Sequence, residues 1–256
     1  MATLGRYPER IPVTFLASAV SAALAAIVFL SLAEPARVKP KEGFIRMGVN
    51  GLRTLLARGA LRAYATNAVT ISAVTFFAFW FYQPVCQHAG LSVAYLGLIG
   101  AGFNLFATIL LGQLPLLERA FGLGRLLFLS ALVPGLLFLS LGAVHRLVFV
   151  VPAFFVIVGC KMVRMPILND FINHHIESEN RATVISSVSL LERSVALLMY
   201  PVVGRLADVS LDAALFFLGG LCVVFAVITH VGSPHIERMP AASRPTPTSG
   251  GGMAVE

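Results

Sequence analysis

Hydrophobic residues in this chain fall into seven continuous runs that are separated by polar connections. Each run is about 20 residues long, which is the length that an α-helix needs to cross a hydrocarbon core of about 30 Å. The pattern predicts an all-α fold, a polytopic membrane bundle of seven transmembrane helices. The predicted spans cover residues 11–33, 64–84, 91–111, 126–143, 147–165, 183–203 and 211–231.

The segments outside the last six runs have separate interpretations. Arg6 and Arg10 precede the first run as they would a secretory signal, but a signal has an apolar core of only roughly 7 to 15 residues, so we expect a retained helix. The basic connection 34–61 carries apolar residues at helical spacing, and it either lies in the membrane interface or forms a solvated linker helix. Residues 232–256 are rich in Pro, Ser, Thr and Gly, which predicts a disordered cytoplasmic tail.

Composition argues against an ordinary soluble protein. Of the 256 residues, 57% are hydrophobic and 12% are charged, and the mean hydropathy is +0.85. Soluble domains carry about 25% charged residues, so the lipid bilayer is the predicted partner of this surface. The net charge is +7, but the Lys and Arg residues do not gather on one basic face, so no nucleic-acid partner is predicted. Cys86, Cys160 and Cys222 are isolated, and neither a disulfide, a metal nor a cofactor is predicted.

The distribution of positive charge predicts the orientation. Of the nineteen Lys and Arg residues, fourteen fall on one side, with Lys161 and Arg164 among them, four fall on the other, and Arg193 lies inside a span. Cytoplasmic connections carry the positive excess in membrane proteins. We therefore expect a multi-pass protein of the cell's inner (cytoplasmic) membrane, with its amino terminus outside and its carboxyl terminus in the cytoplasm.

A glycine-rich string follows the third predicted span. Residues 112–125 read GQLPLLERAFGLGR, which is similar to the cytoplasmic signature G-x-x-x-[DE]-R-x-G-x-[RK] of the major facilitator superfamily, with extra residues before the acid. Glycines allow tight turns, and the acid and arginine can cap helix ends. The string predicts a gating loop whose candidate residues are Gly112, Glu118, Arg119, Gly124 and Arg125.

Two further strings point to the same family. Between the fifth and sixth predicted helices lie residues 164–170 (RMPILND) and 181–186 (RATVIS). They resemble the corresponding loop of bacterial drug-efflux facilitators. The resemblance makes Arg164 and Arg181 candidates for a gating loop. Residues 201–208 (PVVGRLAD) resemble the outward loop before the family's final helix.

Together, these strings and the six closely spaced spans resemble the carboxyl-terminal half of a major facilitator superfamily transporter, which is built from 3+3 inverted repeats. The resemblance implies a last helix of the first half at 1–33, a basic cytoplasmic loop at 34–61, a six-helix half at 62–231 and a tail at 232–256. It implies transport of an unidentified small-molecule substrate by proton-coupled efflux, without enzymatic activity. Substrate sites in this superfamily lie between two halves, so we expect a partial chain that needs a first half as its partner.

Polar residues inside the spans are the candidate site residues, because such residues face protein or water rather than lipid. Glu192 lies about 14 Å into its span at 1.5 Å per residue, close to the bilayer centre. Adjacent helix positions diverge, so Arg193 cannot pair with it, whereas Lys161 on the preceding helix could reach it. Glu192 either carries protons, with Arg193 tuning it, or belongs to an ion pair that serves packing only.

Four more residues are candidates for a substrate or proton pathway: Asn67, Asn104, Tyr82 and Gln83. The two asparagines could instead bond neighbouring helices, and Tyr82 could anchor the helix end in the membrane interface together with Trp80. His174 and His175 are predicted to be a solvated loop pair rather than metal ligands.

Two other classes of membrane protein were weighed. A retinal-binding receptor would need a Schiff-base lysine in its last span, and residues 211–231 contain no lysine. A membrane-embedded enzyme needs a nucleophile and a base that converge within the spans, and the histidines lie near or outside the span ends. A non-transporting membrane fragment and a receptor-like seven-helix protein remain as alternatives.

Overall fold

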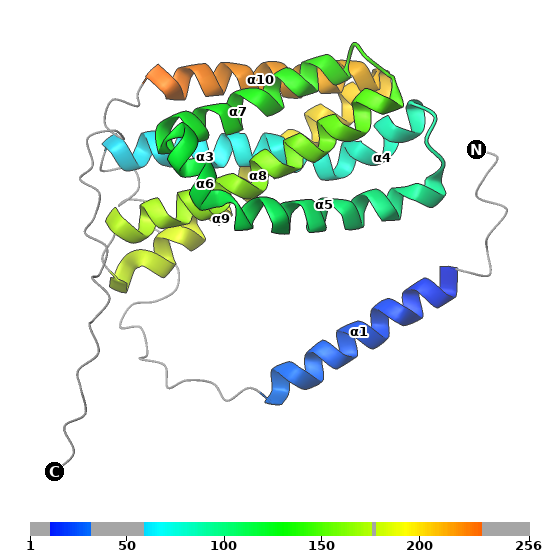
Figure 1. Cartoon of the computed structure of the whole chain (residues 1–256), viewed down its shortest axis with the longest axis horizontal. Helices are drawn as coiled ribbons and strands as arrows, with labels where there is room; N and C mark the ends of the chain where they lie inside the picture. Colours follow the sequence, from blue (N-terminus) through cyan, green and yellow to red (C-terminus); the bar gives the residue numbers. More distant parts are fainter. Residues whose placement is uncertain (1–10, 32–58, 176–177, 232–256) are drawn as a thin grey trace. The chain divides into compact units, whose positions relative to one another are not determined.

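The computed structural model describes residues 11–31, 59–175 and 178–231, and this part of the chain contains helices and no strand (Figure 1). The chain divides into two units, Met1–Gly43 and Phe44–Glu256. The first unit contains helix α1, Ile11–Ser31, which is apolar along its length. The predictions for 34–58 and for the 232–256 tail lie outside the described residues.

The second unit is a bundle of antiparallel helices (Figure 1). Its elements, in chain order, are α3 (Gly59–Phe76), α4 (Ala78–His88), the short 3-10 helix η2 (Val93–Tyr95), α5 (Leu96–Gly112), α6 (Leu114–Phe121), α7 (Leu123–Leu141), α8 (Leu147–His175), α9 (Ser178–Val209) and α10 (Leu211–Val231). Helices α3 and α4 follow each other along one line and are separated by a turn at Phe77.

Six helical segments of this unit are long and apolar enough to cross a membrane, which supports a membrane-embedded protein. They are Ala65–His88, Val93–Gly112, Leu123–Leu141, Leu147–Asp170, Thr183–Val209 and Leu211–Ile228. The remaining predicted span, the first in the chain, corresponds to α1, whose apolar part within the residues searched, Ser18–Leu30, is shorter than these six. The seven-span count therefore stays a prediction.

Helix boundaries differ from the sequence prediction most clearly at α8 and α9. The predicted end of the last span at 231 is confirmed. By contrast, residues 164–170 and 204–208 were expected in connections, and both lie within helices. The prediction was wrong because it took each polar residue after an apolar run as the end of a helix. A polar residue can continue a helix when its side chain turns toward the bundle interior, as Arg164 does, being fully buried.

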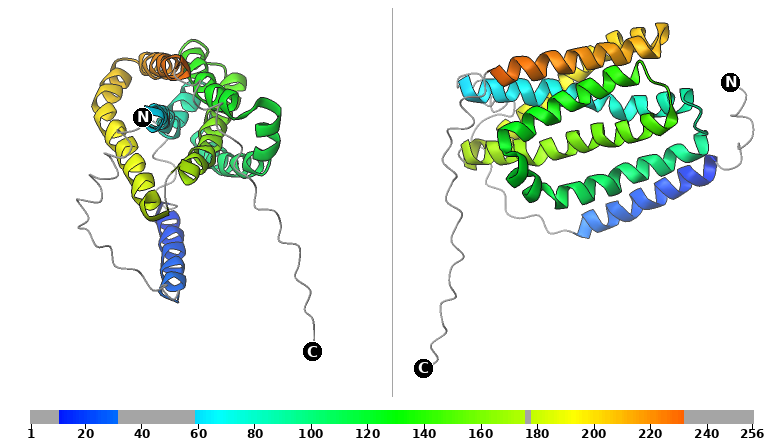
Figure 2. Two further views of the ribbon diagram at one scale, coloured as in Figure 1. Left: turned by 90° about the vertical axis from the view of Figure 1, so that its left-hand side faces the viewer. Right: turned by 45° about the horizontal axis from the view of Figure 1, so that its top comes forward.

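Helices α7 and α10 approach each other closely at two glycines. A Cβ atom placed on Gly219 of α10 would lie 2.7 Å from the backbone nitrogen of Leu139 and 2.8 Å from the carbonyl oxygen of Gly135, both on α7. Small residues at such crossings let helix backbones approach within van der Waals contact. Figure 2 shows the two helices side by side in both views.

The remaining contacts arrange the other helices around α3 and α8. Helix α8 packs against α5, α7 and α4, while α3 packs against α9 and α10. The main buried core runs between these helices and includes Phe77, Phe138, Phe154, Leu215 and Leu218.

The least covered helices of the bundle are α5 and α9. In the most apolar 18-residue stretch of each helix, only 11% of the residues in α9 and 17% of those in α5 are buried, against 33% for each of α7 and α10. Those two helices cover each other, whereas α5 and α9 each keep one long face open.

Candidate functional site

Two cationic residues lie in the interior of the bundle on α8. Lys161 is 9% exposed and Arg164 is fully buried. They are three positions apart, so they lie on neighbouring parts of one helix face. Both residues had been counted among the fourteen Lys and Arg residues of the cytoplasmic connections. Without them, twelve positive residues remain on that side against four on the other, so the predicted orientation is the same.

Lys161 makes contacts with two other helices. Its Nζ donates to the backbone carbonyl of Ser72 on α3 at 3.1 Å and lies 3.7 Å from Oε1 of Glu192 on α9. The ammonium also lies 5.2 Å from the centre of the Phe76 ring, which is within range of a cation–π interaction. Lys161 and Glu192 thus come together as expected from the sequence, while their functional role stays a prediction.

Arg164 ties α8 to α3 and α7. Its Nη1 donates to the carbonyl oxygen of Leu127 and to the hydroxyl of Ser130, each at 3.1 Å. Its Nη2 donates to the carbonyl oxygen of Asn67 at 3.3 Å and to the side-chain oxygen of the same residue. Arg164 was expected in a gating loop, and the structure places it in the core instead. Asn67, a pathway candidate, is a partner of this guanidinium.

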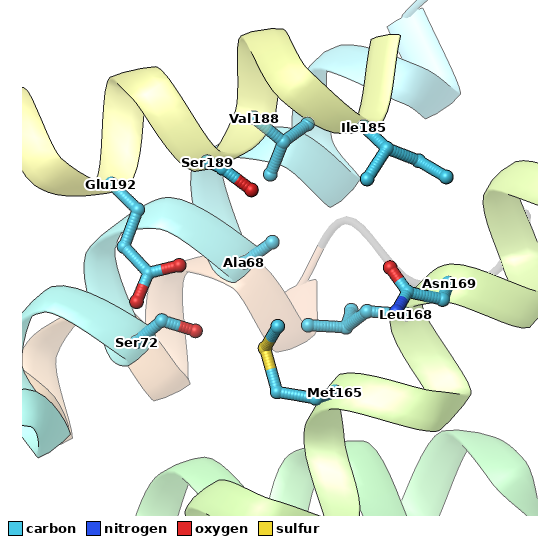
Figure 3. Close-up of a pocket in the computed structure, with 9 residues that line it drawn as sticks. All are labelled: Ala68, Ser72, Met165, Leu168, Asn169, Ile185, Val188, Ser189 and Glu192. Atoms are coloured by element: carbon cyan, nitrogen blue, oxygen red, sulfur yellow. The ribbon is translucent and has the colours of Figure 1, made fainter. Parts of the chain in front are cut away.

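A small cavity lies beside the Glu192 carboxylate, between α3, α8 and α9 (Figure 3). Its volume is about 20 Å³, which is room for about one water molecule. Its polar lining comes from Ser72, Asn169, Ser189 and Glu192, and its apolar lining from Ala68, Met165, Leu168, Ile185 and Val188. A water molecule held here would have hydroxyl and amide partners next to the carboxylate.

Arg193 diverges from Glu192, as the sequence predicted. The Glu192 side chain turns toward Lys161 and the cavity, while Arg193 is exposed on the open face of α9. The same open face carries Leu190 and Leu197, which are 66% and 68% exposed. A guanidinium among apolar residues on a membrane span needs a protein or water environment.

The other pathway candidates lie away from this cavity. Tyr82 is buried on α4, where its ring packs edge-on against Phe103 at 5.2 Å and its hydroxyl accepts from Gln83 at 3.3 Å. Asn104 is exposed on α5 and donates from its side-chain amide to the carbonyl of Gly100 at 3.0 Å. None of these residues is among those that line the Glu192 cavity.

The predicted gating string forms two turns around the short helix α6. Helix α5 ends at Gly112, Glu118 and Arg119 lie on α6, and Gly124 and Arg125 lie in the first turn of α7. The tight turn falls at Gly122, whose φ of +74° is a left-handed conformation that favours glycine. The side chain of Arg181, the last gating candidate, lies outside the described residues.

The structure also shows a cluster that the sequence did not predict. Nε2 of His145, in the connection after α7, lies 2.8 Å from Oδ1 of Asp212 at the start of α10. The His88 ring at the end of α4 lies 5.1 Å from the His145 ring, centre to centre. No sequence signal links these residues, because they lie at or near the ends of different helices. The described residues contain no group of three or more His, Cys, Asp or Glu side chains placed to hold a metal.

Comparison with known proteins adds no family to these observations. No protein-family model matches the chain, and no curated protein sequence matches it.

Proposed function

We propose that this chain is the carboxyl-terminal part of a secondary transporter of the major facilitator type, and that it moves a small solute in a proton-coupled cycle. The observation that carries the proposal is the Lys161–Glu192 pair, with a distance of 3.7 Å, inside two membrane-spanning helices. Charged residues at such depth are expensive, and they mark ion and substrate pathways by default. Glu192 is the group proposed to take up and release the proton, and the cavity beside it has room for about one water molecule.

The pattern of helix contacts supports a pair of three-helix repeats. One triplet is α3, α5 and α7, and the other is α8, α9 and α10. If α3 is matched with α8, α5 with α9 and α7 with α10, then the contact between α5 and α8 corresponds to the contact between α9 and α3, and both are present. The same matching turns α7–α8 into α10–α3 and leaves α7–α10 unchanged. A two-fold relation between two triplets produces such a pattern, and repeats of this kind are usual in secondary transporters.

The open faces of α5 and α9 support a second half as partner. These two helices are the least covered of the six, and the face of α9 presents Arg193 at membrane depth. A second helical half packed against them would enclose the arginine and would leave a solute pathway between the halves. With α1 as a further span, the chain would cross the membrane seven times. Its amino terminus would then lie outside and its carboxyl terminus in the cytoplasm.

The proposal is tested by solute flux into proteoliposomes under an imposed pH gradient. The chain is reconstituted alone and together with a polypeptide that supplies the other five helices of a first half. We expect no flux above empty vesicles from the chain alone and restored flux from the two halves together. Flux from the chain alone would contradict the half-domain assignment, and the absence of flux from both would contradict transport.

A further inference from the structure

The charge balance around Lys161 depends on one carboxylate. Among the residues that the structure describes, Glu192 is the acid that pairs with Lys161, and the other two contacts of the ammonium are the neutral Ser72 carbonyl and the Phe76 ring. Both charged side chains are largely withdrawn from solvent, with 11% of the Lys161 side chain and 21% of the Glu192 side chain exposed. A proton on Glu192 would therefore leave a poorly solvated cation without its anionic partner, which is unfavourable.

Among the residues whose side chains the structure describes, the other acids of α8 and α9 lie far along their helices from the pair: Asp170 is nine positions beyond Lys161, and Asp208 is sixteen positions beyond Glu192. Helix α3 contributes Ser72 and Phe76 on this side, and α10 carries no charged residue over 213–228. On α8, Arg164 is a second cation near Lys161, and its bonds go to α3 and α7. On α9, Arg193 is exposed and also cationic. Protonation of Glu192 thus leaves a locally positive region.

The cavity beside Glu192, which Lys161 does not line, has room for about one water molecule. Its polar groups other than the carboxylate are the Ser72 and Ser189 hydroxyls and the Asn169 amide. Hydroxyl and amide groups can donate hydrogen bonds to an anion as well as accept them from water. A cationic solute would have to compete with the tethered ammonium of Lys161 for the single carboxylate.

We propose that the transported solute is an anion, and that it binds to the Lys161 ammonium in place of Glu192 when Glu192 is protonated. The proton goes to a carboxylate oxygen of Glu192, Lys161 keeps its three protons, and no covalent bond to carbon is made or broken. This inference rests on the proposed function and adds the sign of the solute's charge. Because proton and anion bind together, they cross the membrane in the same direction, as in symport. Proton-coupled efflux is usually driven by antiport, in which the proton and the solute cross in opposite directions.

Equilibrium binding to the purified full chain tests the inference without any need for flux. The probes are radiolabelled benzoate and inorganic phosphate as anions, and tetraethylammonium as the cation. Between about pH 8 and about pH 5, the affinity for at least one anion should rise by about tenfold or more, because binding is linked to uptake of a proton. Tetraethylammonium should bind no better at the lower pH.

Variants of the two charged residues separate their roles. Glu192→Gln should bind the anion with the same affinity across the pH range, close to that of the parent chain at the lower pH. Lys161→Met should lose anion binding. Two substitutions of exposed residues on α9, Asp208→Asn and Arg205→Met, are the matched controls and should keep the pH dependence of the parent.

Several outcomes would overturn the inference. They are no anion binding by the parent chain, anion binding that does not change with pH, and binding of tetraethylammonium in preference to both anions. If Glu192→Gln fails to fold, the pH dependence of the parent chain decides the matter by itself. Acid-dependent anion binding together with absent flux from the completed transporter would refute the proposed function and leave the anion site standing. Flux from the completed transporter without anion binding would refute the anion site and leave the proposed function standing.

Discussion

Nζ of Lys161 lies 3.7 Å from Oε1 of Glu192, and the same nitrogen donates at 3.1 Å to the carbonyl of Ser72. One ammonium thus connects α8 with both α9 and α3. Its charge is opposed by one carboxylate and by neutral groups only. Loss of the Glu192 charge would weaken the α8–α9 contact and would leave the α8–α3 hydrogen bond in place.

Arg164 should matter for stability rather than for proton uptake. Arg164→Met removes the donors that serve the Leu127 carbonyl, the Ser130 hydroxyl and Asn67. Buried acceptors without donors cost about 1–3 kcal/mol, so we expect a free energy of unfolding lower by at least that amount. Chemical denaturation of the detergent-solubilised protein measures it. Arg205→Met, at an exposed position, is the control, and equal stability of the two variants would contradict the assignment of Arg164 to the core.

The α7–α10 contact should not tolerate a methyl group at its closest point. Gly219→Ala places a Cβ atom 2.7 Å from the backbone nitrogen of Leu139, so the two helices must separate. Overpacking of this kind costs about 1–3 kcal/mol, and a lower unfolding temperature should show it. Gly220→Ala, at the next position, meets no atom within 4 Å and should change little. A Gly219→Ala variant as stable as Gly220→Ala would place this helix contact elsewhere.

Hydrophobic patterning was sufficient to predict most of the helices. Glu192 stood out because an acid in the middle of an apolar run must find a protein or water environment, and the preceding helix offered Lys161 at a suitable level. Both inferences need only the rise of a helix and the cost of charge in a membrane. The α8–α9 contact that brings the two residues together was expected for the same reason.

The places where prediction failed depend on which side of a helix faces the interior. Lys161 and Arg164 were counted with the charges of a connection, and Arg164 was expected in a gating loop, whereas both turn inward on a helix that continues to His175. Ser130 gave no signal either, since a serine in a span is common and only the position of Arg164 gives it a partner. The His145–Asp212 contact joins two helix ends that are adjacent in space alone, which a single sequence does not encode locally.

The proposed orientation places the connection before α5 outside and α6 inside. In a background without the three native cysteines, a cysteine at Ser92 should react with a membrane-impermeant maleimide in intact cells. A cysteine at the exposed Ala120 of α6 should react only after permeabilisation. Both positions avoid Gly90, whose φ of +95° would strain a substituted side chain. Reaction at Ala120 in intact cells would invert the orientation.

The central claim is that Glu192 gains and loses a proton within the bundle instead of remaining a permanently charged partner of Lys161. Infrared difference spectroscopy of the reconstituted chain measures this directly, through the carboxylic acid C=O band that appears on acidification from about pH 8 to about pH 5. We predict a band in the parent chain and in Asp208→Asn that is absent from Glu192→Gln, with all three proteins expressed at similar levels. Identical difference spectra for the parent and Glu192→Gln would contradict the account and would make the pair a structural one.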